Sequence, residues 1–389
     1  MKSLNILLIN MSNFGEWQRG VSNRNFHLWQ QLEKMPDVNK ILCVDYPPHT
    51  WKRMLRNIKE TFITPPSGIK ILKRGWWGAL YKVNERVYVY SAFDFWWRPK
   101  AFVSRLGQAL SQLEMNDYIL WSLYPSIMPH TKHLPKPQLT IFDAVDNWSE
   151  HSSYLKQRQQ LQEAYSFIKK NTDIIFTVSE DLQKLFDSQA NVYWIPNGVD
   201  LKHYQKPWKL VNRDIADLPR PIIGYIGVIQ TRVDLPLIRY LAEKNPDKSF
   251  ALCGPVWYAE EMKALETLPN IYFLGYKEYD EAPMYIQQFD VALIPHKKDL
   301  FISSTNPMKM YEYLACGKPV VATAGAGAEM FRDEIFIAHN HEEFNQKLQE
   351  ALEFRSPEDS ERRRKLMENY SWAKTVKHML DIVQKKIQP

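Results

Sequence analysis

Cysteine is scarce in this sequence: only Cys43, Cys253 and Cys316 occur in 389 residues. They are far apart, odd in number and each surrounded by apolar residues, and no CxxC pair or Cys/His group accompanies them. Neither a disulfide framework nor a zinc site is therefore expected. We predict three buried free thiols.

Long apolar runs are also missing. None approaches the about 20 residues that cross a bilayer. The first run stops at Asn10, which is too short for the hydrophobic segment of a secretion signal. Leu4–Ile9 is better explained as a buried strand, and we expect a cytoplasmic protein. Low-complexity segments and solenoid repeats are absent as well, which indicates ordinary folded domains.

Short apolar runs alternate with amphipathic stretches along the chain, a pattern typical of parallel sheets covered by helices. The length of 389 residues fits two α/β domains, each a doubly wound, Rossmann-like sheet, that face a central cleft. The turn Ile195–Asp200 predicts a boundary near residue 200, with one domain over 1–200 and the other over 201–370.

The pattern also predicts where the individual elements lie. The predicted strands are Leu4–Ile9, Ile41–Asp45, Val87–Tyr90, Tyr118–Trp121, Leu139–Ala144, Ile174–Val178, Val192–Ile195, Pro221–Gly227, Ser249–Cys253, Ile271–Leu274, Val291–Ile294 and Pro319–Ala322. The predicted helices include Arg24–Met35, His151–Lys170, Leu235–Asn245, Met308–Cys316 and Glu342–Glu353.

The most informative segment spans residues 304–323, with the sequence STNPMKMYEYLACGKPVVAT. Asn306 suits the N-cap of a short helix and Pro307 its first position, while Gly317 suits the residue after its C-cap. The helix start suits a phosphate, because its first N–H groups are unpaired and Lys309 adds a full charge. Glu312 points from nearly the same face, where its carboxylate can bind a ribose diol. A surface Lys–Glu pair is the alternative.

The stretch Glu312–Thr323 resembles the donor motif of GT-B glycosyltransferases, especially the large family-four-like group 1. The resemblance runs from about Phe176 to the end, although Ser304 stands where similar enzymes usually have the first of two glutamates. It implies the GT-B fold and a final helix, 371–389, that returns to the first domain. Further matching stretches are Ile195–Asp200, Gly224–Gly227, Leu252–Pro255 and Asn270–Tyr276.

The same resemblance implies roles for residues on the donor side. Gly227 would let the backbone approach the phosphates, Arg232 would neutralise them, and Tyr276 would lie at the nucleobase. A solvated loop arginine and a structural tyrosine are the alternatives. Similar enzymes most often use a UDP-sugar, which we take as the expected donor. No Asp-x-Asp donor motif or His/carboxylate cluster occurs, so we expect neither a metal ion nor another cofactor.

The acidic stretch from Asp143 to Asp146 directly follows a predicted strand, at the sheet edge where α/β proteins bind ligands. An attacking hydroxyl must lose its proton to a nearby base if the reaction inverts configuration. Asp146 is our first candidate for this base and Asp143 the second. Similar stretches occur in bacterial surface-polysaccharide glycosyltransferases that resemble teichuronic acid biosynthesis enzymes. The alternative is a capping carboxylate for a helix that begins near His151.

The loop after the first strand contains Gly20 and leads into a helix that carries Arg24 and His27. Gly20 allows a tight turn, and the two side chains are second-tier candidates for contacts with the acceptor or with a phosphate. A structural role for either side chain is the alternative.

Tryptophan and basic residues concentrate between Trp51 and Arg105, where twelve Lys or Arg residues face only three acidic ones. Indole rings and lysines together suit an anionic membrane surface, where a lipid-linked acceptor would lie. Single-stranded nucleic acid could use the same residue types, but no nucleic-acid-binding motif accompanies them. The other alternative is a set of core tryptophans under a solvated basic face. The tryptophans are Trp51, Trp76, Trp77, Trp96 and Trp97.

The residues and the resemblance together predict a glycosyltransferase of the hexosyltransferase type. It would move a sugar from a nucleotide sugar to a hydroxyl of a glycan or lipid-linked acceptor, in synthesis of the bacterial cell wall or another surface polysaccharide. We expect it in the cytoplasm, peripheral at the inner face of the cell membrane. The alternatives are a non-catalytic nucleotide-sugar-binding or scaffold protein, suggested by Ser304, and a nucleotide-sugar epimerase of the same fold.

Overall fold

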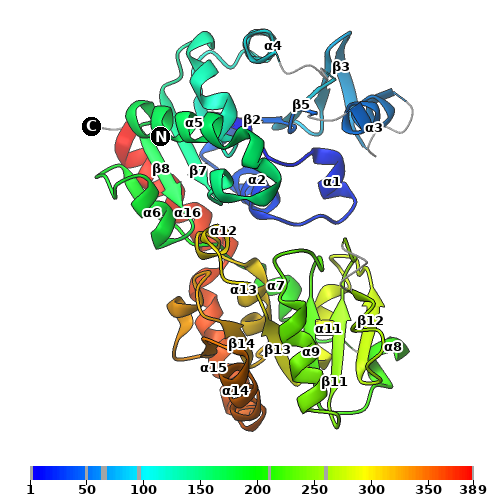
Figure 1. The fold of residues 1–389 in the computed structure, drawn as a ribbon. Helices are drawn as coiled ribbons and strands as arrows, with labels where there is room; N and C mark the ends of the chain where they lie inside the picture. The colour runs from blue at the N-terminus through cyan, green and yellow to red at the C-terminus, as the bar shows by residue number, and fades with distance from the viewer. Residues whose placement is uncertain are drawn as a thin grey trace. The chain divides into compact units, whose positions relative to one another are not determined.

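Two units, each built around one sheet, make up the computed structural model of this protein (Figure 1). The structure describes residues 3–48, 51–62, 68–93, 98–208, 212–257 and 262–387. The first unit consists of Met1–Ile195 and Val376–Pro389, and the second of Pro196–Thr375. The chain therefore enters the second unit once and comes back to the first for its last residues.

The sheet of the first unit has the strand order β3-β4-β5-β2-β1-β6-β7-β8-β9. Its strands from β5 to β9 pair in parallel, whereas β3, β4 and β5 form an antiparallel edge. The strands are β1 (Leu4–Ile9), β2 (Val38–Val44), β3 (Lys70–Gly75), β4 (Gly78–Lys82), β5 (Val87–Ala92), β6 (Ile119–Ser122), β7 (Leu139–Ala144), β8 (Ile174–Thr177) and β9 (Val192–Trp194).

Helices cover both faces of this sheet, because each face carries its own apolar core. The α4, α5 and α6 helices pack on one face, and α1, α2 and the end of α16 on the other. The helices are α1 (Phe14–Gln18), α2 (Arg24–Lys34), α3 (Trp51–Phe62), α4 (Pro99–Gln112), α5 (Arg158–Asn171), α6 (Glu180–Leu185) and α16 (Trp372–Ile387), with 3-10 turns η1 (Pro125–His133), η2 (Trp148–Glu150) and η3 (Ser152–Gln157).

The second unit has a parallel sheet with the order β12-β11-β10-β13-β14-β15. One face packs against α9 and α14, and the other against α11, α13 and the end of α15. The strands are β10 (Ile222–Ile226), β11 (Ser249–Cys253), β12 (Ile271–Gly275), β13 (Val291–Ile294), β14 (Val320–Thr323) and β15 (Ile335–Ala338).

Helices in this unit range from single turns to 13 residues. They are α7 (Leu201–Tyr204), α8 (Arg213–Ala216), α9 (Leu235–Lys244), α11 (Ala282–Gln288), α12 (Leu300–Ser303), α13 (Met308–Ala315), α14 (His341–Glu353) and α15 (Pro357–Met367), with 3-10 turns η4 (Ala328–Phe331) and η5 (Glu368–Tyr370).

The predicted strands are all confirmed, and the three cysteines are buried free thiols as expected. The helix predicted over His151–Lys170 begins too early, because the chain makes the 3-10 turn η3 there and α5 begins only at Arg158. The β3, β4 and β15 strands were not predicted. Among the described residues, no helix is both long and apolar enough to cross a bilayer.

Candidate functional site

Helix α13 lies between α12 and β14 along the chain. The sequence predicted its C-terminus correctly but not its N-terminus. Gly317 is confirmed as the residue after the C-cap: its φ is +75°. Its N–H bonds the carbonyl of Leu314, and Lys318 N–H bonds that of Tyr313, which together form a Schellman motif. The N-cap prediction is wrong. Pro307 takes that position, and the helix begins at Met308.

Asn306 does not cap α13 because its side chain is engaged elsewhere. It is buried, and its Oδ1 accepts hydrogen bonds from the backbone N–H of Asn197 at 2.9 Å and from the Tyr311 hydroxyl at 2.8 Å. Asn197 returns a second bond to the Asn306 carbonyl at 2.6 Å. Asn306 therefore fixes the loop before α13 from inside, and its role is to position this loop.

Lys309 projects from the first turn of α13 onto β10. Its Nζ donates to the Tyr225 hydroxyl at 2.9 Å and lies 4.2 Å from the centre of the Tyr225 ring. Gly227, just after β10, has φ +139°, and a Cβ built there would come within 2.9 Å of Lys309 Nζ. The structure thus brings Lys309 and Gly227 together, and the positive φ of Gly227 is one that other residues rarely adopt.

Arg232 and His296 belong to the same neighbourhood. Residues Val233 and His296 form an antiparallel bridge, and the Arg232 carbonyl accepts from Lys297 N–H at 2.9 Å. Burial and the positive charges of Lys309 and Arg232 hold the pKa of His296 well below its ordinary value. Two predicted cations therefore act on one buried imidazole, a residue that the sequence analysis missed.

Glu312 lies one turn further along α13, and its carboxylate has unusual acid–base behaviour. Burial raises its pKa to about 7, against the opposing effects of a hydrogen bond with the Tyr204 side chain and of the positive charge of Lys309. Tyr204 itself is buried. The Tyr204 side chain, from α7, thus holds the Glu312 carboxylate in place. A carboxylate that binds a diol needs such a fixed position.

Tyr276 lies at the end of β12, apart from these groups in the strand order. It is 52% exposed, and its hydroxyl donates to Glu278 at 3.3 Å. Gly275, the residue before it, has φ +69° and accepts a bond from Gly254 N–H at 2.8 Å. The exposure excludes a core tyrosine, and a surface tyrosine stays the alternative to a ring that stacks with a base.

In the first unit, Asp143 and Arg24 form a buried ion pair. Both Asp143 oxygens lie 3.1 Å from Arg24 Nε, and Arg24 is 4% and Asp143 0% exposed. A carboxylate without solvent access and with a bidentate partner does not suit a general base. The structural alternative fits Arg24, and we no longer consider Asp143 a catalytic candidate.

Asp146 differs from Asp143 because it is partly exposed, just beyond the carboxyl end of β7. Its backbone carbonyl accepts from the Tyr165 hydroxyl at 3.1 Å, which fixes the chain at this point. The alternative of a capping carboxylate for a helix at His151 is not supported, since α5 begins twelve residues after Asp146, at Arg158. Asp146 remains the candidate base.

Gly20 and His27 both have structural roles. Gly20 has φ +83° and follows the C-cap of α1, so a left-handed residue is needed there. His27 is 2% exposed, and its ring packs 5.1 Å from that of Phe26. Burial keeps His27 from contact with a phosphate or an acceptor.

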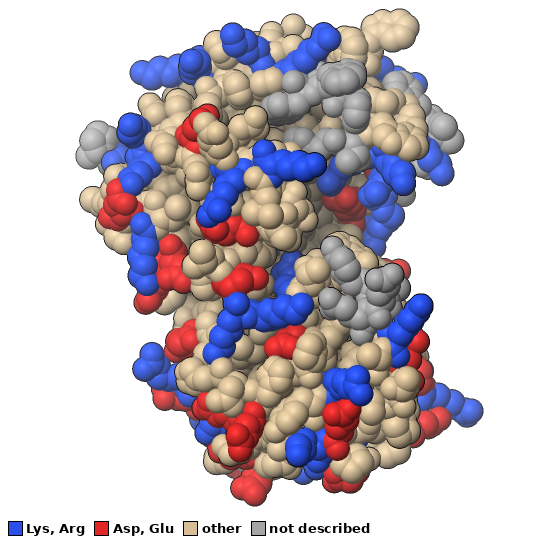
Figure 2. Space-filling view, in the orientation of Figure 1, with Lys and Arg blue, Asp and Glu red and all other residues tan. Residues whose placement is uncertain are grey.

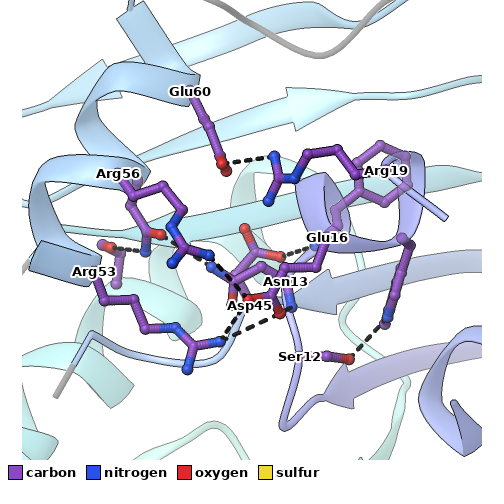
Figure 3. Close-up of polar contacts among 12 residues, drawn as sticks. Ser12, Asn13, Glu16, Arg19, Asp45, Arg53, Arg56 and Glu60 are labelled. Carbon is purple, nitrogen blue, oxygen red and sulfur yellow. Dashed lines mark hydrogen bonds and ion pairs between the residues drawn. The ribbon is translucent and has the colours of Figure 1, made fainter. Parts of the chain in front are cut away.

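A polar cluster joins α3 to the loop after β1 (Figure 3). Glu16 accepts from Arg53 at 3.1 Å and from Arg56 at 3.4 Å, so two cations of α3 hold one carboxylate. Asp45, at the end of β2, accepts from Phe14 N–H at 2.7 Å, and burial raises its pKa to about 7. Glu16 thus links α3 to α1, and Asp45 holds the start of α1 at the end of β2.

The second unit matches a known family. Residues 220–353 match the model described as "Glycosyl transferases group 1". The second unit thus carries a group 1 glycosyl transferase domain, and the chain has the GT-B fold, since it aligns over nearly its full length with enzymes of that fold. Among proteins of known sequence it is 28% identical over 218 residues to TuaH of Bacillus subtilis (strain 168), a protein assigned provisionally as a teichuronic acid biosynthesis glycosyltransferase.

That alignment covers 52% of this chain, and the chain spans only about half of TuaH, 55% of its length. Among solved structures, HepE of Anabaena in complex with UDP has a TM-score of 0.68 at 14% identity, covering 99% of this chain and 100% of HepE. Sucrose-phosphate synthase of Thermosynechococcus elongatus has a TM-score of 0.70 at 13% identity, covering 98% of both chains. Both likenesses establish the fold.

The residues that the sequence analysis missed are aromatic or buried. Tyr225 lies in β10 within the matching stretch Gly224–Gly227, where only the glycine was singled out, and Tyr204 lies in a one-turn helix outside any motif. His296 comes two residues after the end of a predicted strand, which is the sequence signal that could have found it.

Proposed function

We propose that this protein is a glycosyltransferase that moves a hexose-type sugar from a nucleoside diphosphate sugar to a hydroxyl of a glycan or lipid-linked acceptor. The placement of Lys309 against Gly227, in a group 1 glycosyl transferase domain, is the observation that supports this most strongly. A cation at a helix start, beside a backbone without a side chain, suits a diphosphate. Glu312 would bind the ribose diol.

A UDP-sugar is the proposed donor, and bacterial surface-polysaccharide synthesis the proposed pathway class. The structures of HepE with UDP and with UDP-glucose support the first, and the likeness to TuaH supports the second. In the proposed reaction the acceptor oxygen bonds to the anomeric carbon while the bond from that carbon to the diphosphate breaks. The diphosphate leaves with the electron pair, and Asp146 takes the acceptor proton if configuration inverts.

Calorimetric titration with UDP, ADP and GDP tests the donor site. Lys309→Ala should weaken UDP binding at least about tenfold, because a charge-assisted hydrogen bond contributes about 1.5–3 kcal/mol, and Glu312→Ala should weaken it as well. Lys347 and Glu350 provide the control, since they form an exposed Lys–Glu pair with the same spacing on α14. Their alanine variants should bind UDP like the wild type. Equal binding by all four variants would exclude the donor site.

We further propose that the transfer needs no metal ion. Lys309 and Arg232 would neutralise the leaving diphosphate, a role that divalent cations fill in other enzymes. Sugar transfer should then continue unchanged in EDTA. An activity that EDTA abolishes and Mg²⁺ or Mn²⁺ restores would show that these two side chains are not sufficient.

A second candidate function, binding of a nucleotide sugar without transfer, is favoured by Ser304. This residue is buried, and its hydroxyl donates to the Phe301 carbonyl at 2.7 Å, so it cannot replace a glutamate that contacts the donor. UDP-sugar binding without release of UDP, with or without acceptor glycans, would support this function.

The proposed location of the enzyme is an anionic membrane surface. Trp76 is 94% and Trp77 53% exposed at the turn between β3 and β4, and Trp51 is 54% exposed on α3, so these three are not core tryptophans. Trp96 and Trp97 lie outside the described residues. Figure 2 shows many Lys and Arg side chains on the amino-terminal unit. Because α3 packs on β5, which pairs with β4, the exposed rings lie at one sheet edge.

A further inference from the structure

A pocket of about 390 Å³ in the second unit lies at the opposite end of the sheet from the groups assigned above to the diphosphate. Phe289 and Asp290, which line it, come just before β13, and Lys318 and Pro319 come just before β14. These strands run parallel to β10, so the pocket opens at their amino ends, whereas Gly227 follows the carboxyl end of β10. Its volume lies within the range of about 300–1,000 Å³ that ligand sites usually have.

Lys318 is partly buried in the wall of this pocket. Its Nζ donates to the Gln287 carbonyl at 2.7 Å, which uses one of its three N–H groups. Burial lowers the pKa of this amine to about 8, and the positive charges of Arg220 and Arg364 contribute to the shift. Among the described residues, no carboxylate forms an ion pair with Lys318. The ammonium group therefore lacks a negative partner.

Arg355 adds a second cation to the pocket and has N–H groups to spare. Its Nη1 donates to Asp290 at 2.9 Å and its Nε to the Leu352 carbonyl, so three of its five N–H groups remain. The Arg355 side chain is 44% exposed, so a molecule in the pocket can reach these groups. The Ser360 hydroxyl, from α15, lines the same pocket and is also partly exposed. Three segments of the chain therefore direct hydrogen-bond donors to one cavity.

The two carboxylates that line the pocket do not offset these donors equally. Asp290 accepts from Arg355, from Arg220 at 3.0 Å and from Ile222 N–H at 2.7 Å, so its charge is already matched. Glu353, the last residue of α14, is exposed and is the group that would repel an anion. The hydrogen-bonding capacity that is left in the pocket is therefore mainly that of cations.

We propose that this pocket binds a phosphate group, whose oxygens accept hydrogen bonds from Lys318, Arg355 and Ser360. Phosphate oxygens are strong acceptors, and their charge supplies the partner that Lys318 lacks. The phosphate has two sources, inorganic phosphate and a small phosphorylated metabolite. The proposal does not rest on the function proposed above, because none of these residues belongs to the donor site.

A titration of the full chain with inorganic phosphate, followed by phosphorus-31 NMR in about 0.15 M salt, tests the proposal under conditions that screen exposed charges. All proteins in this titration carry Lys309→Ala, which removes the cation assigned to the donor diphosphate. Lys318→Met removes the charge and keeps an unbranched side chain, and Arg355→Gln removes the second cation. The matched control is Lys248→Met, since the Lys248 side chain is only 10% exposed and directly precedes β11 at the same end of the sheet.

Phosphate should bind to the protein with Lys309→Ala alone and equally to the Lys248→Met control. Lys318→Met should weaken this binding at least about tenfold, as expected for one lost charge-assisted hydrogen bond, and Arg355→Gln should weaken it too. Glu353→Gln should strengthen it, because a repelling charge is removed at an exposed position. Thermal unfolding shows which variants are folded, and the two exposed positions decide if Lys318→Met is not.

Three results overturn the proposal: no phosphate binding, binding that neither Lys318→Met nor Arg355→Gln weakens, and an equal loss in Lys248→Met. A second titration, with glycerol phosphate, separates the two sources. Tighter binding than that of inorganic phosphate, lost in Lys318→Met, assigns the pocket to a phosphorylated metabolite, and binding that is no tighter assigns it to free phosphate. A wild type that binds no UDP contradicts the proposed function, whereas the phosphate titration decides on this pocket.

Discussion

At the scale of single residues, Glu312 makes the stability of the second unit depend on pH. Its carboxyl has a pKa of about 7 when folded and an ordinary value of 4.5. Between these values the folded protein holds a proton that the unfolded chain releases. The contribution of Glu312 to stability is therefore fully present below pH 4.5 and is lost as the pH rises through about 7.

Glu312→Gln removes this dependence, since glutamine does not ionise. The variant should be more stable than the wild type at pH about 8, by at most about 3 kcal/mol. At pH about 5 the gain should be much smaller. Urea unfolding at both pH values measures the difference. The control is Glu350→Gln, an exposed change on α14, whose effect on the free energy of unfolding should be the same at both pH values. If the effect of Glu312→Gln is equally independent of pH, the folded Glu312 carboxyl has an ordinary pKa.

What the sequence could predict at this scale depends on whether a residue belongs to a local pattern. Lys309 lies in a short helix and Gly317 just after its C-cap, so their conformations followed from the segment itself. Asn306 was predicted wrongly because its partner, Asn197, is 109 positions away. The same holds for Asp143 and Arg24, 119 positions apart, whose pairing only the fold creates.

At the scale of elements, the exposed turn between β3 and β4 gives a test of membrane contact. The double variant Trp76→Ser/Trp77→Ser should lose most of its binding to vesicles that contain anionic phospholipid, because each ring buries apolar area in the interface. Cosedimentation with the vesicles measures this binding. The matched control is Trp257→Ser, which removes a tryptophan that is 64% exposed in the other unit.

Binding to vesicles should also depend on the charge of the lipid. Wild-type binding should weaken with rising salt and should be lost on vesicles of neutral lipid, because the Lys and Arg residues attract only anionic headgroups. Binding that the double variant retains, or that is the same on neutral vesicles, would contradict contact through this turn.

Two of the three strands that the sequence did not predict, β3 and β15, lie at sheet edges. The β3 strand, Lys70–Gly75, alternates neither in polarity nor in burial, because it lies at the exposed sheet edge and pairs only with β4. The central strands are mostly apolar and bounded by turns, so they were predictable. Similarly, the 3-10 turn η3 takes the place of the first residues of one predicted helix.

At the scale of the whole molecule, α16 contributes to the core of the first unit. Val376, Met379, Leu380 and Val383 are buried in the same apolar cluster as β1 and α2. Truncation after Thr375 should destabilise the first unit by more than about 5 kcal/mol, because each buried side chain contributes about 1.5–3 kcal/mol. UDP binding to the second unit should persist.

Calorimetry of the full chain and the truncated chain, each with and without UDP, measures both effects. At 100 times its dissociation constant, UDP should stabilise the second unit by about 2.7 kcal/mol in either chain. Charge reversals at Lys385 and Lys386, in the last turn of α16, leave the four apolar side chains in place and provide the control. A truncated chain that unfolds like the control would show that this core does not depend on α16.

The position of α16 also sets an order for folding during synthesis. Residues 4–195 leave the ribosome first, but the part of one sheet face that α16 covers stays exposed until residues 376–387 have been made. The second unit, 196–375, is already complete by then and can fold beforehand. The half of the chain that is made first is therefore the last to be finished, and it exposes apolar surface for as long as the ribosome needs to make the other half.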